Sequence, residues 1–527
     1  MTATLRRTLL DPRSAASALR RADRLWLLPF AVAGIVLLTT PAGLAVATGA
    51  LLTLGLALLT ASAPRQGVLV LLAALPHQTF LFSGLHRIGV PEPLVRNGGY
   101  WKEAVVIGLA LHAVRHWWAE ERRLDTLDVV ALLYVAFVTL YLAFPQLFVV
   151  ATATGTGGPP TDVLVRTLAY RADVAFVVLL LVGRHAGFDR AFLHRAGRVL
   201  LGSAAIVATL GLFEFVATPA WNALTVDVLR VPQFQFEVFG GVNRRLVDVL
   251  NVGAVGGPGS SLRIGSVFLS PLPLGFYLLA PLAIGLEQVV RRTAPVWVHL
   301  STGLIALCLL LTQTRSAVLG GLVIGVWALR RAPGRTSGTR LRVALLGAAA
   351  LVMLVPTATS TGLGERTSAA FAGEDESTAD HLRGLTTGLE LLTDEPLGRG
   401  LGTAAGIGQR FEVPGTVVPE NYYLQVGNEV GVHAMVAFIA LGLLLVLRLG
   451  RASRFGLGSH ASALQGCAVA LAVGCMFLHV FANLAVAWPV WLLAGMASAP
   501  SRHEVAGSDS PRPGPSSRVT AQQAAGR

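Results

Sequence analysis

Three arginines in the second half of the chain are the residues whose type and position most suggest chemistry. Arg263, Arg315 and Arg383 stand beside or between apolar runs, and each is a candidate to bind an anionic ligand. Arg315 is the sharpest candidate, because the sequence Thr-Gln-Thr-Arg-Ser at 312–316 separates two apolar runs with almost no connecting loop. A charge so close to a membrane boundary is costly and tends to be functional. The alternative is an arginine that snorkels to lipid phosphates, and the sequence alone leaves both interpretations open.

A carboxylate and a glycine-rich run follow between residues 395 and 425. Glu420, Asn421 and Tyr422 precede an apolar run that begins near residue 431, although tyrosines at such positions are also ordinary interfacial anchors. Gly400 lies at the centre of Gly-Arg-Gly-Leu-Gly (398–402), whose glycines permit tight turns and close approach of the backbone to a ligand. Because this run does not follow a strand and open a helix, a structural turn is favoured over a nucleotide site.

The composition is that of a chain whose solvent is the bilayer. Of the 527 residues, 53% are hydrophobic and only 13% are charged, which lies outside the range of soluble globular domains. The net charge of +13 does not indicate nucleic-acid binding, since the arginines occur in short segments between apolar runs and not on one basic face. The three cysteines lie inside apolar runs without metal-ligand spacing, and no acidic metal cluster is evident. We therefore expect no metal and no cofactor.

The apolar runs predict an all-α, polytopic membrane helix bundle. A helix needs about twenty apolar residues to cross the hydrocarbon core, and the chain offers about fourteen such runs. They fall near 25–40, 42–62, 67–85, 101–118, 127–149, 165–183, 196–218, 264–287, 296–312, 316–330, 341–358, 431–449, 463–481 and 484–499. The last two runs are expected to form a tight hairpin near Asn483.

Arginine placement predicts the orientation of these spans. Arg-rich segments occupy every second connection, from the N-terminal segment to 448–454, whereas an alternate connection such as 152–161 carries no positive charge. By the positive-inside rule, both termini are expected to be cytoplasmic in a multi-pass protein of the cytoplasmic membrane. The large segment 359–428 then faces outward, and the leucine spacing over 382–392 predicts a short amphipathic helix within it.

The expected organisation has seven parts. They are a basic cytoplasmic segment (1–24), N-terminal transmembrane helices (25–218), an extracytoplasmic loop (219–262), transmembrane helices with arginine motifs (263–358), a large extracytoplasmic catalytic loop with short helices (359–428), C-terminal transmembrane helices (429–499) and a disordered cytoplasmic tail (500–527).

The second half of the chain resembles the O-antigen ligase and polymerase family of bacterial surface-polysaccharide assembly, over roughly residues 260–450. The residues that carry the resemblance occur in family order. They are Arg-Ile-Gly-Ser-Val-Phe at 263–268 with Ser-Pro at 270–271, Thr-Gln-Thr-Arg-Ser-Ala at 312–317, Arg383, Glu-Pro-Leu-Gly-Arg-Gly-Leu-Gly at 395–402 and Glu-Asn-Tyr-Tyr-Leu at 420–424.

The resemblance implies a glycosyltransferase of exopolysaccharide or cell-envelope biosynthesis. Its donor would be an oligosaccharide linked to a polyprenyl diphosphate on the outer face, and its acceptor a glycan, which makes it either a polymerase or a ligase. It implies that Arg263, Arg315 and Arg383 bind the diphosphate, that Asn421, Tyr422 and Gly400 contact substrate, and that Glu420, Arg315 and Arg383 are catalytic. A polysaccharide flippase or a chain-length regulator is an expected partner.

One departure concerns the general base. Ligases of this family typically carry a histidine just before the Asn of the last motif, and this chain has Glu420 there. A carboxylate within hydrogen-bond reach of the acceptor hydroxyl can take the same role. Two alternatives remain: a transporter or flippase of lipid-linked saccharides, although no internal repeat is visible, and a membrane scaffold with a degenerate site.

Overall fold

The computed structural model describes residues 42–120, 123–145, 161–239, 263–291, 294–330, 376–454 and 459–499. These residues are 83% helical and contain no strand, so the predicted all-α class is confirmed for them. The basic N-terminal segment, the apolar runs 25–40 and 341–358 and the tail 500–527 lie outside the described residues.

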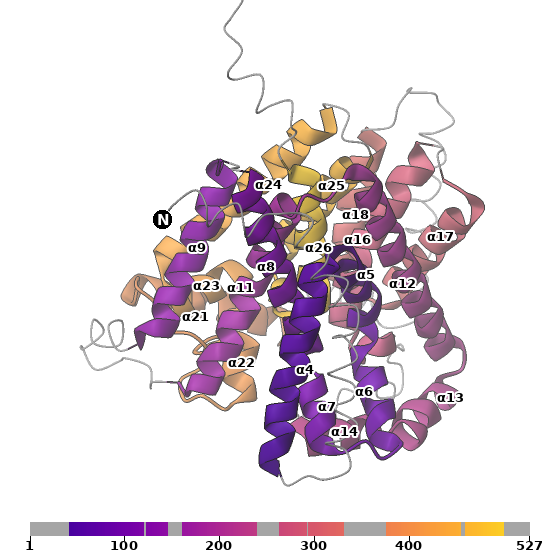
Figure 1. Ribbon diagram of the computed structural model, residues 1–527, viewed down its shortest axis with the longest axis horizontal. Helices are drawn as coiled ribbons and strands as arrows, with labels where there is room; N and C mark the ends of the chain where they lie inside the picture. The colour runs from indigo at the N-terminus through magenta and orange to yellow at the C-terminus, as the bar shows by residue number, and fades with distance from the viewer. Residues whose placement is uncertain are drawn as a thin grey trace, which may run out of the picture.

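Figure 1 shows how the described helices are arranged. In the first half they are α4 (Ala42–Ser62), α5 (Pro64–Ala74), η1 (Leu75–His77), α6 (Gln78–Arg87), α7 (Glu92–Gly98), α8 (Trp101–Glu120), α9 (Thr126–Ala143), α11 (Val163–His185), α12 (Arg190–Val216), α13 (Thr218–Asn222), η2 (Ala223–Val228) and α14 (Val231–Phe239). In the second half they are η4 (Ser266–Phe268), α16 (Pro271–Val290), α17 (Val296–Leu311), α18 (Arg315–Arg330), α21 (Glu376–Asp394), α22 (Ala405–Arg410), α23 (Tyr422–Val430), α24 (Val432–Arg454), α25 (Ser459–Gly474), η5 (Val480–Ala482) and α26 (Leu484–Ser498).

Within the described ranges, five helical stretches are long and apolar enough to cross a membrane: Pro64–Arg87, Thr126–Ala143, Arg190–Val216, Pro271–Val290 and Val432–Arg454. Shorter apolar helices occupy Gly49–Ser62, Val296–Leu311, His460–Gly474 and Leu484–Ser498. These helices indicate a membrane protein. The expected total of about fourteen spans, which assumes about twenty apolar residues per span, stays a prediction.

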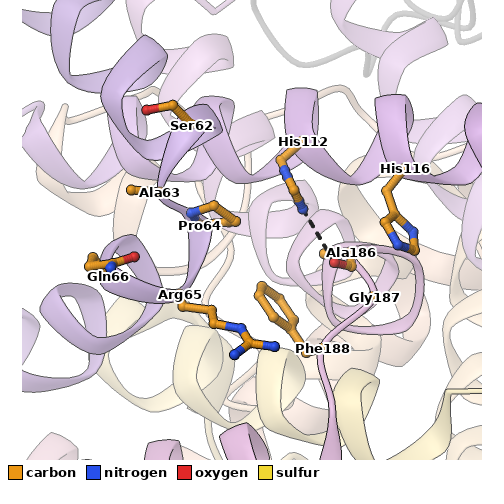
Figure 2. A pocket seen from close by; sticks show the side chains of 10 residues that line it. All are labelled: Ser62, Ala63, Pro64, Arg65, Gln66, His112, His116, Ala186, Gly187 and Phe188. Atoms are coloured by element: carbon orange, nitrogen blue, oxygen red, sulfur yellow. Dashed lines mark hydrogen bonds between the residues drawn. The ribbon is translucent and has the colours of Figure 1, made fainter. Parts of the chain in front are cut away.

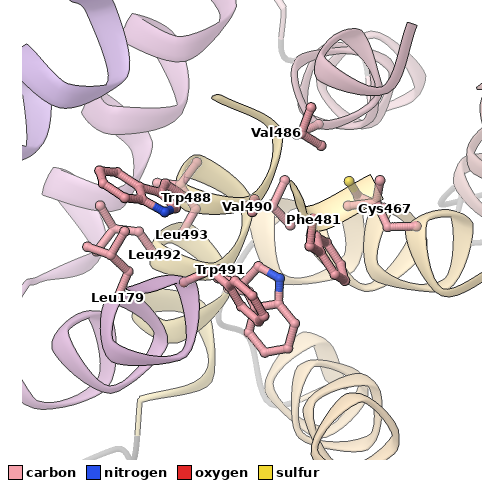
Figure 3. Packing of buried hydrophobic residues seen from close by; sticks show 14 of the residues in the cluster. Leu179, Cys467, Phe481, Val486, Trp488, Val490, Trp491, Leu492 and Leu493 are labelled. Carbon is pink, nitrogen blue, oxygen red and sulfur yellow. The ribbon is translucent and has the colours of Figure 1, made fainter. Parts of the chain in front are cut away.

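The core of the bundle forms around α11 and α26, which pack closely against each other. Glycines make this approach possible, because a Cβ atom at Gly495 would overlap the backbone of Leu180 and one at Gly183 would overlap that of Leu492. Aromatic rings fill the space beside the two helices, with the rings of Phe176 and Trp491 4.9 Å apart. Figure 3 shows Phe481 and Trp491 in this packing, next to leucines of α11 and α26.

Helices α9 and α11 define two opposite ends of the bundle. At one end, which we call the motif end, the hydroxyl of Tyr141 in α9 donates to the carbonyl of Leu397. The hydroxyl of Thr161, just before α11, donates to the carbonyl of Leu401 (2.9 Å) at the same end. At the other end, the basic end, Arg184 of α11 binds Asp125 (2.6 Å), the residue that precedes α9. The two helices therefore run in opposite directions between the ends.

Two expected boundaries differ from the structure. The segment 219–262 was predicted as a loop, but residues 219–239 are largely helical in α13, η2 and α14, because Phe234 and Val238 are buried with Val95 of α7. The run 463–481 ends as a regular helix at Gly474, and a turn with η5 leads to Asn483, whose side chain caps α26 by accepting from Ala485 N (3.0 Å). The short helices expected within 359–428 are present as α21, α22 and α23.

Candidate functional site

Arg263 and the segment before Arg315 come together although they are distant in the sequence. The Arg263 Nε atom donates to the carbonyl of Thr312 (3.2 Å), and its Nη2 atom lies 3.4 Å from Thr314 Oγ1. Thr314 Oγ1 in turn donates to the carbonyl of Pro271 at the start of α16 (3.1 Å). Arg315 is the first residue of α18 and its side chain is exposed. These contacts define the first cluster, which holds two of the predicted arginines at the motif end.

Glu214, near the end of α12, anchors the Arg263 segment from the first half of the chain. One carboxylate oxygen, Oε2, accepts hydrogen bonds from the backbone N–H groups of Gly265 (3.0 Å) and Ser266 (2.6 Å). The Ser266 hydroxyl also donates to the carbonyl of Val207 in the same helix (2.8 Å). A carboxylate at the end of an apolar run was the only sequence signal for this role, and it was missed.

The glycine-rich turn at 398–402 is docked against the end of α23. Arg399 N donates to Asn428 O (2.8 Å) and Gly400 N donates to Glu429 O (2.9 Å). Gly398 and Gly402 need their glycine identity, because both have positive φ and a Cβ would meet Gly431 N or Val165 Cγ1 at 2.6 Å. Gly400 also has a positive φ (102°), but a Cβ there would meet nothing within 4 Å. The predicted structural turn is therefore observed, and Gly400 is the position in it where a Cβ atom would meet no neighbouring atom.

Asn421 and Tyr422 are both used in holding α23 in place. Asn421 Oδ1 accepts from Leu424 N (3.0 Å) as a helix cap, and Nδ2 donates to the carbonyl of Met476 (3.1 Å). Tyr422 is fully buried, and its hydroxyl donates to Asp173 Oδ1 in α11 (2.8 Å). Glu420 precedes the helix with a partly buried side chain. The substrate contacts expected of Asn421 and Tyr422 stay predictions, and the structure adds a positioning role for both residues.

Helix α21 brings Arg383 beside this segment. Cβ atoms at Gly384 and Gly388 would meet the carbonyl of Val418 at 2.6 Å and Pro419 Cβ at 2.8 Å, so the helix lies directly on the residues that precede Glu420. Arg383 itself is exposed. The second cluster is therefore made of Arg383, the glycine-rich turn and Glu420 with its two neighbours. The predicted residues thus form two clusters.

Backbone strain is concentrated in the motif segments. Among the described residues, positive φ angles outside glycine occur at Arg230, Ser266, Leu269, Gln313, Ala405, Glu412 and Glu420, with values from 45° to 57°. All of these except Arg230 lie in or between the segments that carry the candidate site. Non-glycine residues in this region of φ cost roughly 1–3 kcal/mol each and cluster at functional sites, where the surrounding structure holds them. The value of 45° at Glu420 thus places the candidate base in a strained conformation.

Buried ionisable groups surround the second cluster. The Glu429 carboxyl in α23 is 1% exposed and its Oε1 accepts from Ala404 N (3.1 Å), just after the glycine-rich turn. Burial and the neighbouring Arg171 lower the pKa of Arg410 in α22. Asp173 and Glu429 were missed in the sequence, although a carboxylate inside the apolar run 165–183 is itself a signal.

A separate pocket of about 390 Å³ lies at the basic end (Figure 2). It is lined by Ser62, Ala63, Pro64, Arg65, Gln66, His112, His116, Ala186, Gly187 and Phe188, and none of these is a predicted site residue. Its histidine His112 lies between two carbonyl groups, with Nε2 3.3 Å from Ala186 O. The Arg65 guanidinium already pairs with Asp189.

Within the described ranges, no group of three or more His, Cys, Asp or Glu side chains is arranged to hold a metal ion. The candidate site therefore consists of arginines, one strained glutamate and backbone groups around a glycine-rich turn. Comparison of the chain with protein-family models finds no match, and comparison with curated proteins finds none either.

Proposed function

We propose that the protein is a membrane glycosyltransferase of the O-antigen ligase and polymerase type. It would transfer or polymerise oligosaccharide units from a polyprenyl-diphosphate donor on the outer face of the cytoplasmic membrane, with both termini in the cytoplasm. One observation carries the proposal: strained non-glycine backbone occurs in the Arg263, Arg315 and Glu420 motifs and between the last two. A chain that used these segments only as connections between spans would have no need to maintain such strain.

The proposed reaction uses charge and position without a cofactor. The acceptor hydroxyl attacks the anomeric carbon, the bond from that carbon to the diphosphate oxygen breaks, and the diphosphate leaves with the electron pair. Glu420 takes the proton of the hydroxyl, and the configuration at the anomeric carbon inverts. Arg263, Arg315 and Arg383 hold the diphosphate, because guanidinium binds phosphate oxygens in a bidentate manner and fixed positive charge stabilises the leaving group.

The contacts around the site support these roles. Arg263 is held by Thr312 and Thr314, so its guanidinium is positioned next to the start of α18, where Arg315 lies. Gly400 leaves open space at the second cluster for a sugar or a phosphate. We propose a glycan as the acceptor, and a polysaccharide flippase or a regulator of chain length as a partner in the membrane.

A transporter of lipid-linked saccharides is the second candidate. It is favoured by the buried carboxyls of Asp173 and Glu429, since ionisable groups inside a helix bundle often mark ion-coupled transport. The two candidates differ in their product: a transferase forms a new glycosidic bond, and a transporter moves an unchanged donor.

Glu420→Gln tests the proposed base. Removing a positioned general base is expected to reduce glycan transfer by about 10²–10⁴-fold while donor binding is kept. Glu412→Gln is the matched control, because Glu412 lies in the same segment with a similar φ of 50° but outside the motifs. The measurement is the initial rate of product formation by the purified variants, with donor affinity determined in parallel. Equal rates for the wild type and Glu420→Gln would exclude Glu420 as the base.

A further inference from the structure

Among the residues that the structure describes, two carboxyl groups lie together in the interior without a positive partner. Asp173 of α11 and Glu429 of α23 are each 1% exposed, and these two helices lie next to α9 (Figure 1). Asp173 Oδ1 accepts from the Tyr422 hydroxyl (2.8 Å), and Glu429 Oε1 accepts from Ala404 N (3.1 Å). The fully buried Tyr134 of α9 is close enough to both carboxyls to be influenced by their charge.

In each of the two carboxyl groups, one oxygen atom has no hydrogen-bond donor. Asp173 Oδ2 and Glu429 Oε2 are buried and make no hydrogen bond in the described part of the chain. Buried polar atoms without a partner are rare in proteins, and each calls for an explanation. Two carboxyl oxygen atoms are too few to surround a metal cation such as Ca²⁺, which takes about 6–8 oxygen ligands.

The charged groups nearby do not compensate the two carboxyls. On α11 and α8, Arg171 Nη1 binds Glu103 Oε1 (2.9 Å) and Lys102 Nζ lies 3.5 Å from Glu103 Oε2. Other ionisable groups on the surrounding elements are the thiol of Cys475 beside Tyr422, the ring of His433 against Phe137 and Tyr141, and His479 before η5. Among the described residues, no Arg, Lys or His pairs with Asp173 or Glu429.

We propose that Asp173 and Glu429 form a proton-binding site that holds at least one proton at neutral pH on their free oxygens. Two unpaired carboxylates in a dry interior repel each other and lose their hydration, and taking up a proton relieves both penalties. The two groups titrate as one unit. The site joins α11 to α23 through Tyr422, and it joins α23 to the glycine-rich turn through Ala404. Loss of the proton therefore loosens the docking of the Glu420 segment on the bundle.

The direction of the pH dependence follows from proton counting. Because the folded protein binds more protons at this site than the unfolded chain does, its stability falls as pH rises. In thermal unfolding of the full-length protein in nanodiscs between about pH 5 and pH 8, the wild-type Tm is expected to decrease with pH. Asp173→Asn with Glu429→Gln supplies neutral side chains of the same shape, so this slope is expected to be lost and the Tm at high pH to rise.

A matched control and a second readout keep the proposal falsifiable. Glu287 is also buried (3% exposed), but it pairs with Arg291 (2.8 Å), so Glu287→Gln should keep the wild-type slope. Infrared spectra of the wild type at neutral pH should contain the carbonyl stretch of a protonated carboxyl that shifts in D₂O, and the double variant should lack part of it. Three results would each overturn the proposal. The double variant could keep the wild-type dependence of Tm on pH, or the wild type could lack that infrared band. The third is a Tm that rises with Na⁺ but not with choline. Neither readout uses turnover, so the proposal is independent of the glycosyltransferase function.

Discussion

Replacing Arg315 by glutamine is expected to reduce glycan transfer by about 10²–10³-fold, the effect of removing one preorganised donor for transition-state charge. Arg315 begins α18, and the two threonines that precede it at 312 and 314 are held by Arg263. The residue between them, Gln313, has a φ of 50°, so this turn is held in a strained conformation. Glutamine keeps the ability to donate hydrogen bonds but removes the positive charge that, in the proposed reaction, stabilises the leaving diphosphate.

Arg330→Gln is the control for this substitution. Arg330 ends the same helix and is also exposed, but it lies at the basic end of the bundle. The measurement is the rate of product formation by the purified variants in liposomes, together with the Tm of each. The proposal requires a rate loss for Arg315→Gln without loss of Tm, and a near-normal rate for Arg330→Gln. A near-normal rate for Arg315→Gln would instead support the interpretation of Arg315 as an arginine that only reaches lipid phosphates.

Arg184→Leu is expected to destabilise the protein by about 3–5 kcal/mol, the usual result of breaking a buried ion pair from one side. Arg184 is completely buried, and its guanidinium binds Asp128 Oδ1 and Asp125 Oδ2 (2.6 Å each) and the carbonyl of Ser498 (2.7 Å). It therefore ties the ends of α9, α11 and α26 together. Leucine would leave the Asp128 carboxylate buried without a guanidinium partner, beside the His185 ring (3.0 Å) and the Asp125 N–H group (3.1 Å).

Arg65→Leu provides the comparison for this prediction. Arg65 also pairs with an aspartate, Asp189, but both side chains are about half exposed, at 55% and 49%. Exposed pairs contribute about 0–1 kcal/mol, so this variant should unfold at nearly the wild-type temperature. Thermal unfolding in detergent or nanodiscs measures the Tm of both variants. Similar Tm values for the two variants would show that the network at the basic end does not hold the helices together.

The helical fold could be predicted because the bilayer imposes a strong pattern on the sequence. Runs such as 196–218 and 431–449 are apolar on all sides, and the structure has helices there as α12 and α24. The end of a helix was harder to predict, since the run 463–481 stays apolar beyond Gly474, where the chain turns. Hydropathy does not distinguish a buried turn from a buried helix.

The candidate site could be predicted only where its residues are consecutive. The glycine-rich turn and the Glu420 motif are local in the sequence, and both lie in the second cluster. Asp173, Glu214 and Glu429 act through contacts with residues far away in the chain, so their roles become visible only in three dimensions. For Asn421 and Tyr422 the sequence indicated a substrate contact but did not indicate a structural role. In the structure, their polar groups hold α23 against its neighbours.

The most direct test of the central claim is the product that the wild-type protein forms. Purified protein is reconstituted in liposomes with a polyprenyl-diphosphate oligosaccharide and a glycan acceptor, and the lipids and glycans are analysed by mass spectrometry. The account predicts glycans enlarged by whole oligosaccharide units, together with released polyprenyl diphosphate: a ladder for a polymerase, or a single addition to a different acceptor for a ligase. Unchanged donor that has crossed the bilayer without a new glycosidic bond would contradict the account and identify the protein as a transporter.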